Sequence, residues 1–278
     1  MAEGTERKPV RALVIGAHPD DCEFTAGGLA TKLVARGDVV KFVSATNGDA
    51  GHHRMGGGPL ARRRYEETRA VAAVSGVEYE VLPYPDGRLE ADLATRERFI
   101  ALIREFQPDL LFTHRTNDYH PDHRRTGMLV QDASYLIRVP NICPQVPHLS
   151  TTPVILYLRD GFRKPAPFHA DVVVATDDVL DAKAKMLHCH TSQVYEWLPY
   201  DGGYEAEIPP EGDDAGRLAW MRDRLARRDA VFADRFRERL AERYGDARAK
   251  DIRCAEVFEV SEYGRALPPE QVDMYFPM

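Results

Sequence analysis

The sequence predicts an α/β fold built on a mostly parallel sheet. Short apolar runs alternate along the chain with longer segments of helical periodicity, which is typical of strand–helix–strand units. The motifs whose residue types could bind a metal or catalyse a reaction directly follow apolar runs. This is expected, because ligands bind beyond the carboxyl ends of parallel strands. With 278 residues and 44% hydrophobic composition, the chain can bury a substantial core.

The first half of the chain alternates strand and helix. Strands are expected over residues 12–17, 39–44, 79–82 and 110–113, and helices over 23–35, 59–75, 93–106 and 124–137. Gly27 and Gly28 lie within the first of these helices, although glycine is a poor helix former. The pair therefore indicates a close approach, either by a ligand or another backbone, or by tight packing of the helix on the sheet.

The second half contains shorter elements and one irregular segment. Strands are expected over 154–158, 172–175 and 254–260, the last at an edge, with helices from residue 178 and over the charged region 213–250. Residues 139–153 contain four prolines and cannot form a regular helix or a central strand. We expect this insertion to act as a lid or specificity loop, and the aromatic run 195–204 to help shape the mouth of a pocket.

The composition predicts one domain over residues 10–278, preceded by a disordered lead-in over residues 1–9. No apolar run reaches the roughly 20 residues of a membrane span, and the start of the chain lacks the apolar region of a signal peptide, so a cytoplasmic protein is expected. The net charge of −7 argues against nucleic acids and membrane surfaces as partners. Four widely spaced cysteines predict neither a disulfide framework nor a thiolate zinc site.

The segment from Gly16 to Asp21 is the first candidate site. It reads Gly-Ala-His-Pro-Asp-Asp and joins an apolar run to a helical pattern. His18 and Asp21 have the imidazole and carboxylate chemistry of a divalent-metal site, and the adjacent Asp20 can point elsewhere. The alternative is a turn that only caps the following helix, because Asp and Pro are ordinary helix-start residues.

A second candidate site follows the strand expected over 110–113. It reads His120-Pro121-Asp122-His123 and repeats the His-Pro-Asp pattern of the first site. Two such motifs at the same edge of a sheet can converge. Their convergence would supply more ligands than a capping turn requires.

The two motifs together predict a catalytic metal site. His18, Asp21 and His123 would leave a zinc ion with one open position for water, which favours hydrolysis. Asp20 is the expected general base. His120 is the expected acid, held protonated by the neighbouring Asp122 so that it can stabilise an oxyanion and protonate a leaving amine.

Further candidates stand outside these motifs. Arg64 and Glu67 are three residues apart on one helix face, which fits either a surface ion pair or a site. His190 continues an inward-facing stripe of the helix that starts near residue 178, so it is either a core group or a ligand. His52 and His53 lie in a loop after the second strand and can either rim the pocket or face solvent.

These motifs carry a resemblance to a known family. In order, they are Ala-His-Pro-Asp-Asp-x-Glu with Gly-Gly after it, Arg64-x-x-Glu67, His120-Pro-Asp-His123 and His190-x-Ser-Gln. From about residue 11 to residue 193, the chain resembles the LmbE/PIG-L family of zinc-dependent N-acetylglucosaminyl de-N-acetylases.

The resemblance implies a fold, an activity and a set of roles. The implied fold is a Rossmann-like three-layer sandwich, and the implied substrate is a small amino sugar or sugar conjugate. One zinc ion per chain is implied on His18, Asp21 and His123, with Asp20 as base and His120 as acid. Arg64 is implied to contact the substrate, and His190 gains support as a second substrate-binding residue. A homo-oligomer is compatible with the sequence.

Other functions remain open at this stage. A non-haem Fe(II) enzyme can use the same two histidines and one carboxylate, and Fe²⁺ or another divalent ion can replace zinc. A non-catalytic sugar-binding module would not need Asp20. An NAD-binding turn is excluded, because Gly16-Ala17-His18-Pro19 does not fit Gly-x-Gly-x-x-Gly.

Overall fold

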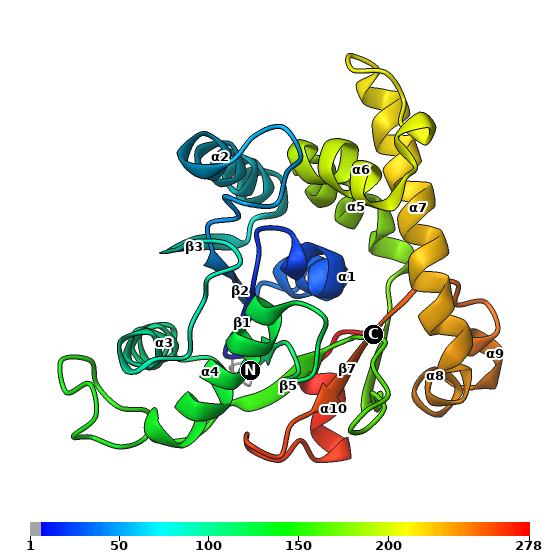
Figure 1. Cartoon of the computed structure of the whole chain (residues 1–278). Helices are drawn as coiled ribbons and strands as arrows, with labels where there is room; N and C mark the ends of the chain where they lie inside the picture. The colour runs from blue at the N-terminus through cyan, green and yellow to red at the C-terminus, as the bar shows by residue number, and fades with distance from the viewer. Residues whose placement is uncertain (1–6) are drawn as a thin grey trace, which may run out of the picture.

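A seven-stranded sheet organises the part of the chain that the computed structural model describes, residues 7–278 (Figure 1). Most of the lead-in predicted over residues 1–9 lies outside the described residues. The strands are β1 (Arg11–Gly16), β2 (Val39–Thr46), β3 (Glu78–Tyr84), β4 (Leu110–Thr113), β5 (Val154–Leu158), β6 (Val172–Ala175) and β7 (Ala255–Val260). Their order in the sheet is β3-β2-β1-β4-β5-β7-β6.

The first five strands are parallel to one another, whereas β7 runs antiparallel to both of its neighbours. The prediction that residues 254–260 form an edge strand is wrong. Phe258 pairs with Leu158 of β5 on one side and with Val172 of β6 on the other, so β6 is the edge strand. Phe258 has no exposed surface, as a central strand requires.

Helices cover both faces of the sheet (Figure 1). The α-helices are α1 (Asp21–Ala35), α2 (Gly57–Ser75), α3 (Leu93–Phe106), α4 (Pro121–Leu136), α5 (Leu180–His188), α6 (Leu198–Gly202), α7 (Asp214–Arg235), α8 (Arg237–Tyr244), α9 (Asp246–Ala249) and α10 (Val272–Tyr275). A π-helical turn, η2 (Gln193–Trp197), leads into α6. This three-layer arrangement confirms the predicted Rossmann-like sandwich. Within residues 7–278, no helix is long and apolar enough to cross a membrane.

Each face of the sheet has its own apolar core. In β1, Leu13 and Ile15 belong to the core that includes α3 and α4, whereas Ala12 and Val14 belong to the core that includes α1. Side chains alternate between the two faces of a strand, so a parallel sheet with helices on both sides buries all of them. Burial of each large apolar side chain contributes roughly 1.5–3 kcal/mol.

The strand order places the two candidate motifs together. β1 pairs with β2 on one side and with β4 on the other, so the chain direction across the sheet reverses between β1 and β4. The loops that leave β1 and β4 therefore diverge to opposite faces and open a crevice at the carboxyl ends of the strands. The first motif follows β1 and the second follows β4, so both border this crevice.

The proline-rich segment 139–153 is irregular, as predicted, but it is not a lid. The segment leads into the amino end of β5, whereas the crevice lies at the carboxyl ends of the strands. None of its residues lines the main pocket. The buried guanidinium of Arg104 on α3 instead holds it, donating hydrogen bonds to the carbonyl groups of Val139, Ile142, Cys143 and Val146.

The glycine pair on α1 serves helix packing. A Cβ atom at Gly28 would lie 2.6 Å from Cγ2 of Thr176, closer than side chains tolerate. The backbone N–H groups of Gly28 and Leu29 donate to the carboxylate of Glu256 on β7, at 2.8 and 2.7 Å. The packing alternative is therefore the right one for this pair.

Candidate metal centre and active site

The loop after β1 directs Asp20 into the crevice instead of using it as a cap. Asp20 is the residue before α1, but its side chain makes no capping hydrogen bond. Its φ of 153° is unusual for a residue other than glycine, and such strain often marks a functional site. The turn is closed by the backbone, since the N–H of Asp20 donates to the carbonyl of His18 at 3.0 Å. The interpretation of this motif as only a helix cap is therefore insufficient.

Three predicted ligands converge with the spacing of a metal site. Nδ1 of His18 lies 3.2 Å from Nε2 of His123 and 3.6 Å from Oδ2 of Asp21, and the last two atoms are 3.5 Å apart. Donors about 2.1 Å from a tetrahedral zinc ion are separated by about 3.4 Å. The two nitrogen atoms and one oxygen atom therefore fit a zinc ion in both chemistry and spacing.

Helix α4 delivers His123 because it approaches the end of β4 unusually closely. A Cβ atom at Gly127 would collide with the carbonyl oxygen of His114. His114 directly follows β4 and stacks on the His123 ring with the ring centroids 4.0 Å apart. Its Nε2 also lies 3.3 Å from Oδ2 of Asp21. His114 is thus a neighbour of two of the predicted ligands.

Carboxylates contact the far nitrogen of each histidine that is predicted to bind the metal. Nε2 of His18 lies 3.1 Å from Asp86 and 3.3 Å from Asp122, and Nδ1 of His123 lies 3.1 Å from Asp118. These contacts place a proton on the far nitrogen and leave the lone pair of the near nitrogen for a metal. Sequence reasoning missed Asp86, Asp118 and the structural role of His114. The position of Asp86 and His114 just after β3 and β4 was the available signal.

Asp122 contacts His18, and its charge does not dominate the pKa of His120. Its carboxylate accepts hydrogen bonds from the backbone N–H groups of Gly87 and Leu89, at 2.7 and 3.2 Å. Burial, together with the charges of His18 and His123, lowers the pKa of His120 below its ordinary value despite the opposing charge of Asp122. This environment does not favour the protonated state expected of His120, and its role as the acid stays a prediction.

The two adjacent aspartates have opposite electrostatic environments. Burial raises the pKa of Asp20 to about 6, although the positive charge of Arg64 opposes the shift. Burial acts on Asp21 too, but His123 and His114 outweigh it and hold the pKa of Asp21 well below its usual range. Asp21 therefore stays ionised as a metal ligand must, whereas Asp20 has the properties of a proton acceptor.

Arg64 lies against the Asp20 turn at the edge of the pocket. It is 1% exposed, its Nη2 donates to the carbonyl of Pro19, and the same atom lies 3.5 Å from Oδ2 of Asp20. The surface ion-pair alternative is therefore excluded. A substrate contact by Arg64 stays a prediction.

His190 lies apart from the pocket. It has no exposed surface, and its Nε2 is 2.7 Å from Oε1 of Glu23, another fully buried group. The prediction that His190 touches the substrate is wrong in this conformation, and the core alternative is right. His52 pairs with Glu196 at 2.9 Å, and His53 stacks on Tyr200. Neither of these two histidines lines the pocket.

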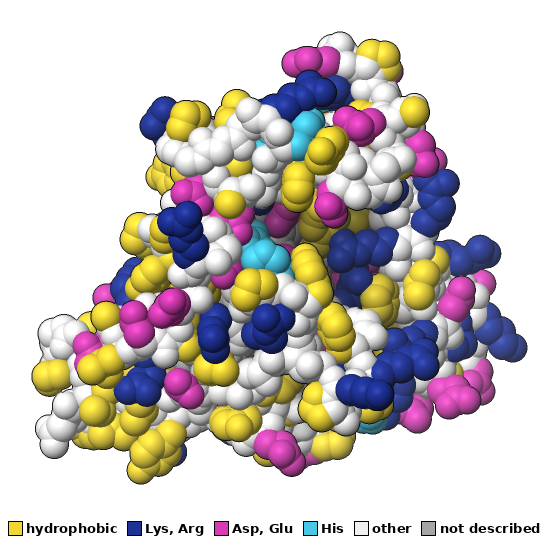
Figure 2. Space-filling model, viewed as in Figure 1, with side chains coloured by type: hydrophobic (Ala, Val, Ile, Leu, Met, Phe, Trp, Pro, Cys, Tyr) yellow, Lys and Arg dark blue, Asp and Glu magenta, His cyan; other side chains and the backbone are white. Residues whose placement is uncertain are grey.

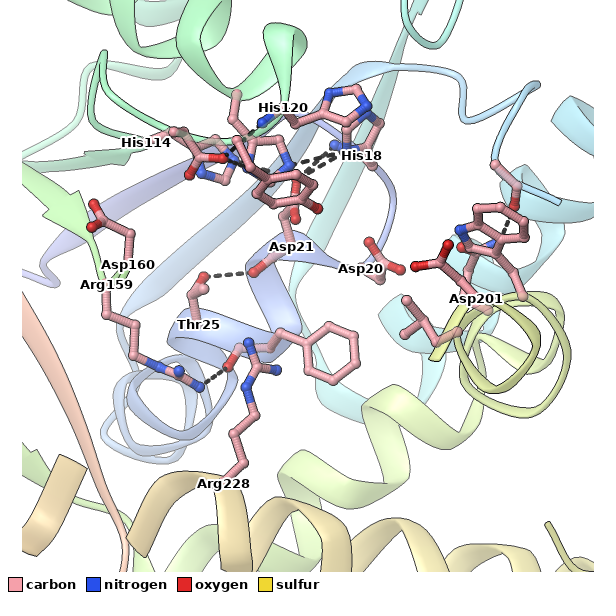
Figure 3. A pocket seen from close by; sticks show the side chains of 18 of the residues that line it. His18, Asp20, Asp21, Thr25, His114, His120, Arg159, Asp160, Asp201 and Arg228 are labelled. Atoms are coloured by element: carbon pink, nitrogen blue, oxygen red, sulfur yellow. Dashed lines mark hydrogen bonds and ion pairs between the residues drawn. The ribbon is translucent and has the colours of Figure 1, made fainter. Parts of the chain in front are cut away.

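The site forms one end of a pocket of about 770 Å³. Figure 2 shows histidine, acidic, basic and apolar side chains around the central hollow. In Figure 3, His18, His114, His120 and Asp21 gather on one side of the pocket, Asp20 points into it, and Arg159 and Arg228 lie on another side. The predicted aromatic run contributes Trp197 and Tyr204 to the lining.

Comparisons with known proteins agree with these motifs. Residues 13–134 match the family described as PIG-L, GlcNAc-PI de-N-acetylase. A 1D-myo-inositol 2-acetamido-2-deoxy-alpha-D-glucopyranoside deacetylase from Corynebacterium diphtheriae is 25% identical over 68% of this chain and 77% of its own length. A 4-oxalmesaconate hydratase from Pseudomonas putida is 24% identical over 68% of this chain and 76% of its own length.

A solved structure also shares the fold. The N,N'-diacetylchitobiose deacetylase from Pyrococcus horikoshii superposes with a TM-score of 0.67 at 23% identity, over 91% of this chain and 84% of that one. The matched segment 13–134 contains both His-Pro-Asp motifs, with all three predicted metal ligands. The predicted resemblance is confirmed over this segment, which matches the PIG-L family model and is supported by relatives that are named as deacetylases.

Proposed function

We propose that this protein is a metal-dependent hydrolase that removes an N-acetyl or other N-acyl group from an N-acetylglucosamine-type amino sugar or sugar conjugate. The observation that carries the proposal is the triangle of His18, Asp21 and His123 donors with the buried carboxylate of Asp20 beside it. A pocket of about 770 Å³ has room for a sugar with an attached group. The names of the deacetylase relatives support this substrate class.

The proposed ligands fit zinc, and Fe²⁺ is the second candidate because two histidines and a carboxylate suit both ions. When bound, the ion supplies polarisation of the acyl carbonyl and lowers the pKa of water from about 15.7 toward about 7. Asp86 and Asp122 orient His18, and Asp118 orients His123. These carboxylates keep the ligand lone pairs directed at the ion.

Asp20 accepts the proton that the attacking water loses as its oxygen bonds to the acyl carbon. With a pKa of about 6 it is ionised near neutral pH, yet it is a stronger base than an ordinary aspartate. The bond between the acyl carbon and nitrogen then breaks, and the proton from Asp20 passes to the leaving amine. The products are a carboxylate and a free amino sugar.

His120 acts as a neutral hydrogen-bond donor in this scheme. Its Nδ1 accepts a hydrogen bond from the backbone N–H of Asp122 at 3.2 Å. In the neutral ring the proton is then on Nε2, which is the donor left to stabilise the oxyanion that develops on the acyl oxygen. Arg64 positions the Asp20 turn and borders the sugar.

A substrate screen with a paired variant tests this function. N-acetylated amino sugars and their conjugates are incubated with the zinc-loaded and the iron-loaded protein, and released acetate and free amine are measured. We expect turnover of at least one conjugate. Asp20→Asn should keep the metal and lose about 100-fold to 10,000-fold in kcat, because it removes the base without removing a ligand. Comparable turnover in this variant would exclude Asp20 as the base.

Hydration of an unsaturated acid is a second candidate, because one relative is named as a 4-oxalmesaconate hydratase. Addition of water to a carbon–carbon double bond can use the same parts, namely a metal ion, an activated water and a base. The same screen separates the two activities when unsaturated dicarboxylates are included and the loss of their ultraviolet absorbance is followed. Hydration without amine release from any amide would replace the deacetylase proposal.

A further inference from the structure

Three arginines line the side of the pocket that is nearest α7. Arg159 follows β5, and Arg224 and Arg228 lie one turn apart on α7; all three line the pocket that contains Asp20 and Asp21. We refer to Arg159, Arg224 and Arg228 as the arginine wall. All three lie outside residues 13–134, the segment that matches the family. The arginine wall is therefore not explained by the motifs of the metal centre.

The charge of Arg159 is balanced inside the protein. Its Nη2 lies 3.1 Å from Oδ1 of Asp229, and Nζ of Lys183 lies 2.6 Å from Oδ2 of Asp229 and 2.9 Å from Glu256. Lys183, Asp229 and Glu256 are fully buried. Two cations thus share two carboxylates, so this buried network as a whole carries no net charge.

Arg224 and Arg228 are not balanced in this way. Neither guanidinium forms an ion pair with a carboxylate of residues 7–278, and the nearby carboxylate of Asp229 is already shared by Arg159 and Lys183. Burial lowers the pKa of Arg228, although the charges of Asp229, Asp20 and Asp21 oppose the shift. The acidic residues of the same pocket, such as Asp160 and Asp201, form no ion pair with either guanidinium.

Aromatic rings orient both unpaired guanidinium groups. The guanidinium carbon of Arg224 lies 3.9 Å from the centroid of the Tyr204 ring, and that of Arg228 lies 4.5 Å from the centroid of Phe24. Stacking covers the flat face of a guanidinium but leaves N–H groups along its edge free to donate. A stacked arginine with a free edge is the arrangement that recognises carboxylates and phosphates.

We propose that the arginine wall binds an anionic group, a carboxylate or a phosphate, on the part of the substrate remote from the scissile amide. The inference rests on the proposed deacetylase function and narrows its substrates to acidic amino-sugar conjugates. Arg224 and Arg228 supply the binding charge. Arg159 packs beside Arg228 and is fixed by Asp229, so it shapes the wall (Figure 3).

Pairs of substrates that differ in charge test the proposal. The first arm compares an N-acetylglucosaminide whose aglycone ends in a carboxylate with the corresponding primary amide. The second arm compares N-acetylglucosamine 1-phosphate with the methyl glycoside. The ratio of kcat/KM for the anionic and neutral members is measured in the zinc-loaded wild-type protein, in Arg224→Gln and in Arg228→Gln. Arg227→Gln is the matched control, because Arg227 is exposed on the same helix and does not line the pocket.

In the wild-type protein, we expect kcat/KM to be higher for the anionic than for the neutral substrate in at least one arm. The arm that shows this preference identifies the bound group as a carboxylate or a phosphate. Each of Arg224→Gln and Arg228→Gln should lower the ratio about tenfold to a hundredfold, as expected for a lost charge-assisted contact. Arg227→Gln should leave it unchanged. A wild-type ratio near one in both arms, or a ratio unchanged in both pocket variants, would overturn the proposal.

Failure of the proposed function would appear differently. If no member of either pair releases an amine, the deacetylase proposal fails, and the arginine wall is tested by binding alone. Isothermal titration of the wild-type protein with the same anionic and neutral compounds then measures the preference without turnover or a variant. Equal dissociation constants would overturn the arginine wall as an anion site.

Discussion

The carboxylate of Asp122 contacts His18, one of the proposed metal ligands. Two backbone N–H groups, of Gly87 and Leu89, hold this carboxylate, and its third contact is Nε2 of His18. We expect Asp122→Asn to lower the affinity for zinc by about 10-fold to 100-fold, because an amide cannot accept all three contacts equally well. Competition with a chromophoric chelator measures the affinity.

The matched control for this prediction is Asp132→Asn. Asp132 lies on the same helix, α4, but it is exposed. Its ion pair with Arg96 is long, with 3.9 Å between Oδ2 of Asp132 and Nη1 of Arg96. Its substitution should leave the zinc affinity unchanged. An unchanged affinity in Asp122→Asn as well would show that the orientation of His18 does not depend on this carboxylate.

The buried pair of His190 and Glu23 makes stability depend on pH. Burial acts to lower the pKa of His190, but the Glu23 carboxylate outweighs it and raises the pKa. With a folded-state pKa above the ordinary value of about 6.5, the pair contributes fully below about pH 6.5, and the contribution is lost as the pH rises through the folded-state pKa. His190→Gln should therefore lower the free energy of unfolding more at about pH 6 than at about pH 9.

Urea denaturation of both proteins at these two pH values measures the difference, with the same zinc concentration throughout. A loss of stability that is the same at both pH values would show that His190 is neutral in the folded protein. The pair would then act through a neutral hydrogen bond.

Single residues differ in how far the sequence could place them. The positions of the proposed ligands His18, Asp21 and His123 were predictable, because each lies at the carboxyl end of a strand or within the first turn of the following helix. The contact of Asp122 with His18 joins residues 104 positions apart, so no local pattern reveals it. The partner of His190 was hidden for the same reason, since Glu23 is 167 positions away.

Among the elements, α1 is joined to β7 by hydrogen bonds from its backbone to the carboxylate of Glu256. Gly28 on α1 leaves room for Thr176 and brings the backbone to Glu256. Alanine is a better helix former by about 1 kcal/mol. We nevertheless expect Gly28→Ala to lower the free energy of unfolding by about 1–3 kcal/mol, because the new methyl group overpacks the contact.

Chemical denaturation tests this prediction, with Gly58→Ala on α2 as the control. A Cβ atom at Gly58 would meet only the flexible end of Arg62 at 3.4 Å, so this variant should be neutral or slightly stabilising. Equal effects of the two substitutions would show that the contact at Gly28 is not tight.

Elements were predictable where local pattern determines them. The alternation of apolar runs and helical segments gave the first five strands and the helices between them, because each is specified by its own periodicity. The position of β7 between β5 and β6 depends on pairing with strands about 100 and 80 residues earlier, which the sequence pattern does not encode. The prediction of a lid over 139–153 was wrong, because the segment leads into the amino end of β5, away from the pocket. Residues of α7 line the pocket instead.

For the whole molecule, we propose that residues 10–278 form one cooperative domain. β7, near the end of the chain, is inserted between two earlier strands and is bonded to α1. Both tryptophans, Trp197 and Trp220, lie in the second half of the chain, whereas circular dichroism reports on all helices. Unfolding followed by tryptophan fluorescence and by circular dichroism should therefore give coincident transitions. Separate midpoints would indicate two domains.

We propose that His18, Asp21 and His123 hold one divalent ion, and the metal content of the purified protein decides whether they do. Elemental analysis of the purified protein should find about one ion per chain, as in other catalytic sites with three ligands. His123→Ala should lose the ion, whereas Asp20→Asn should retain it, with both variants folded by circular dichroism. Full metal occupancy in His123→Ala would contradict the proposed ligand set.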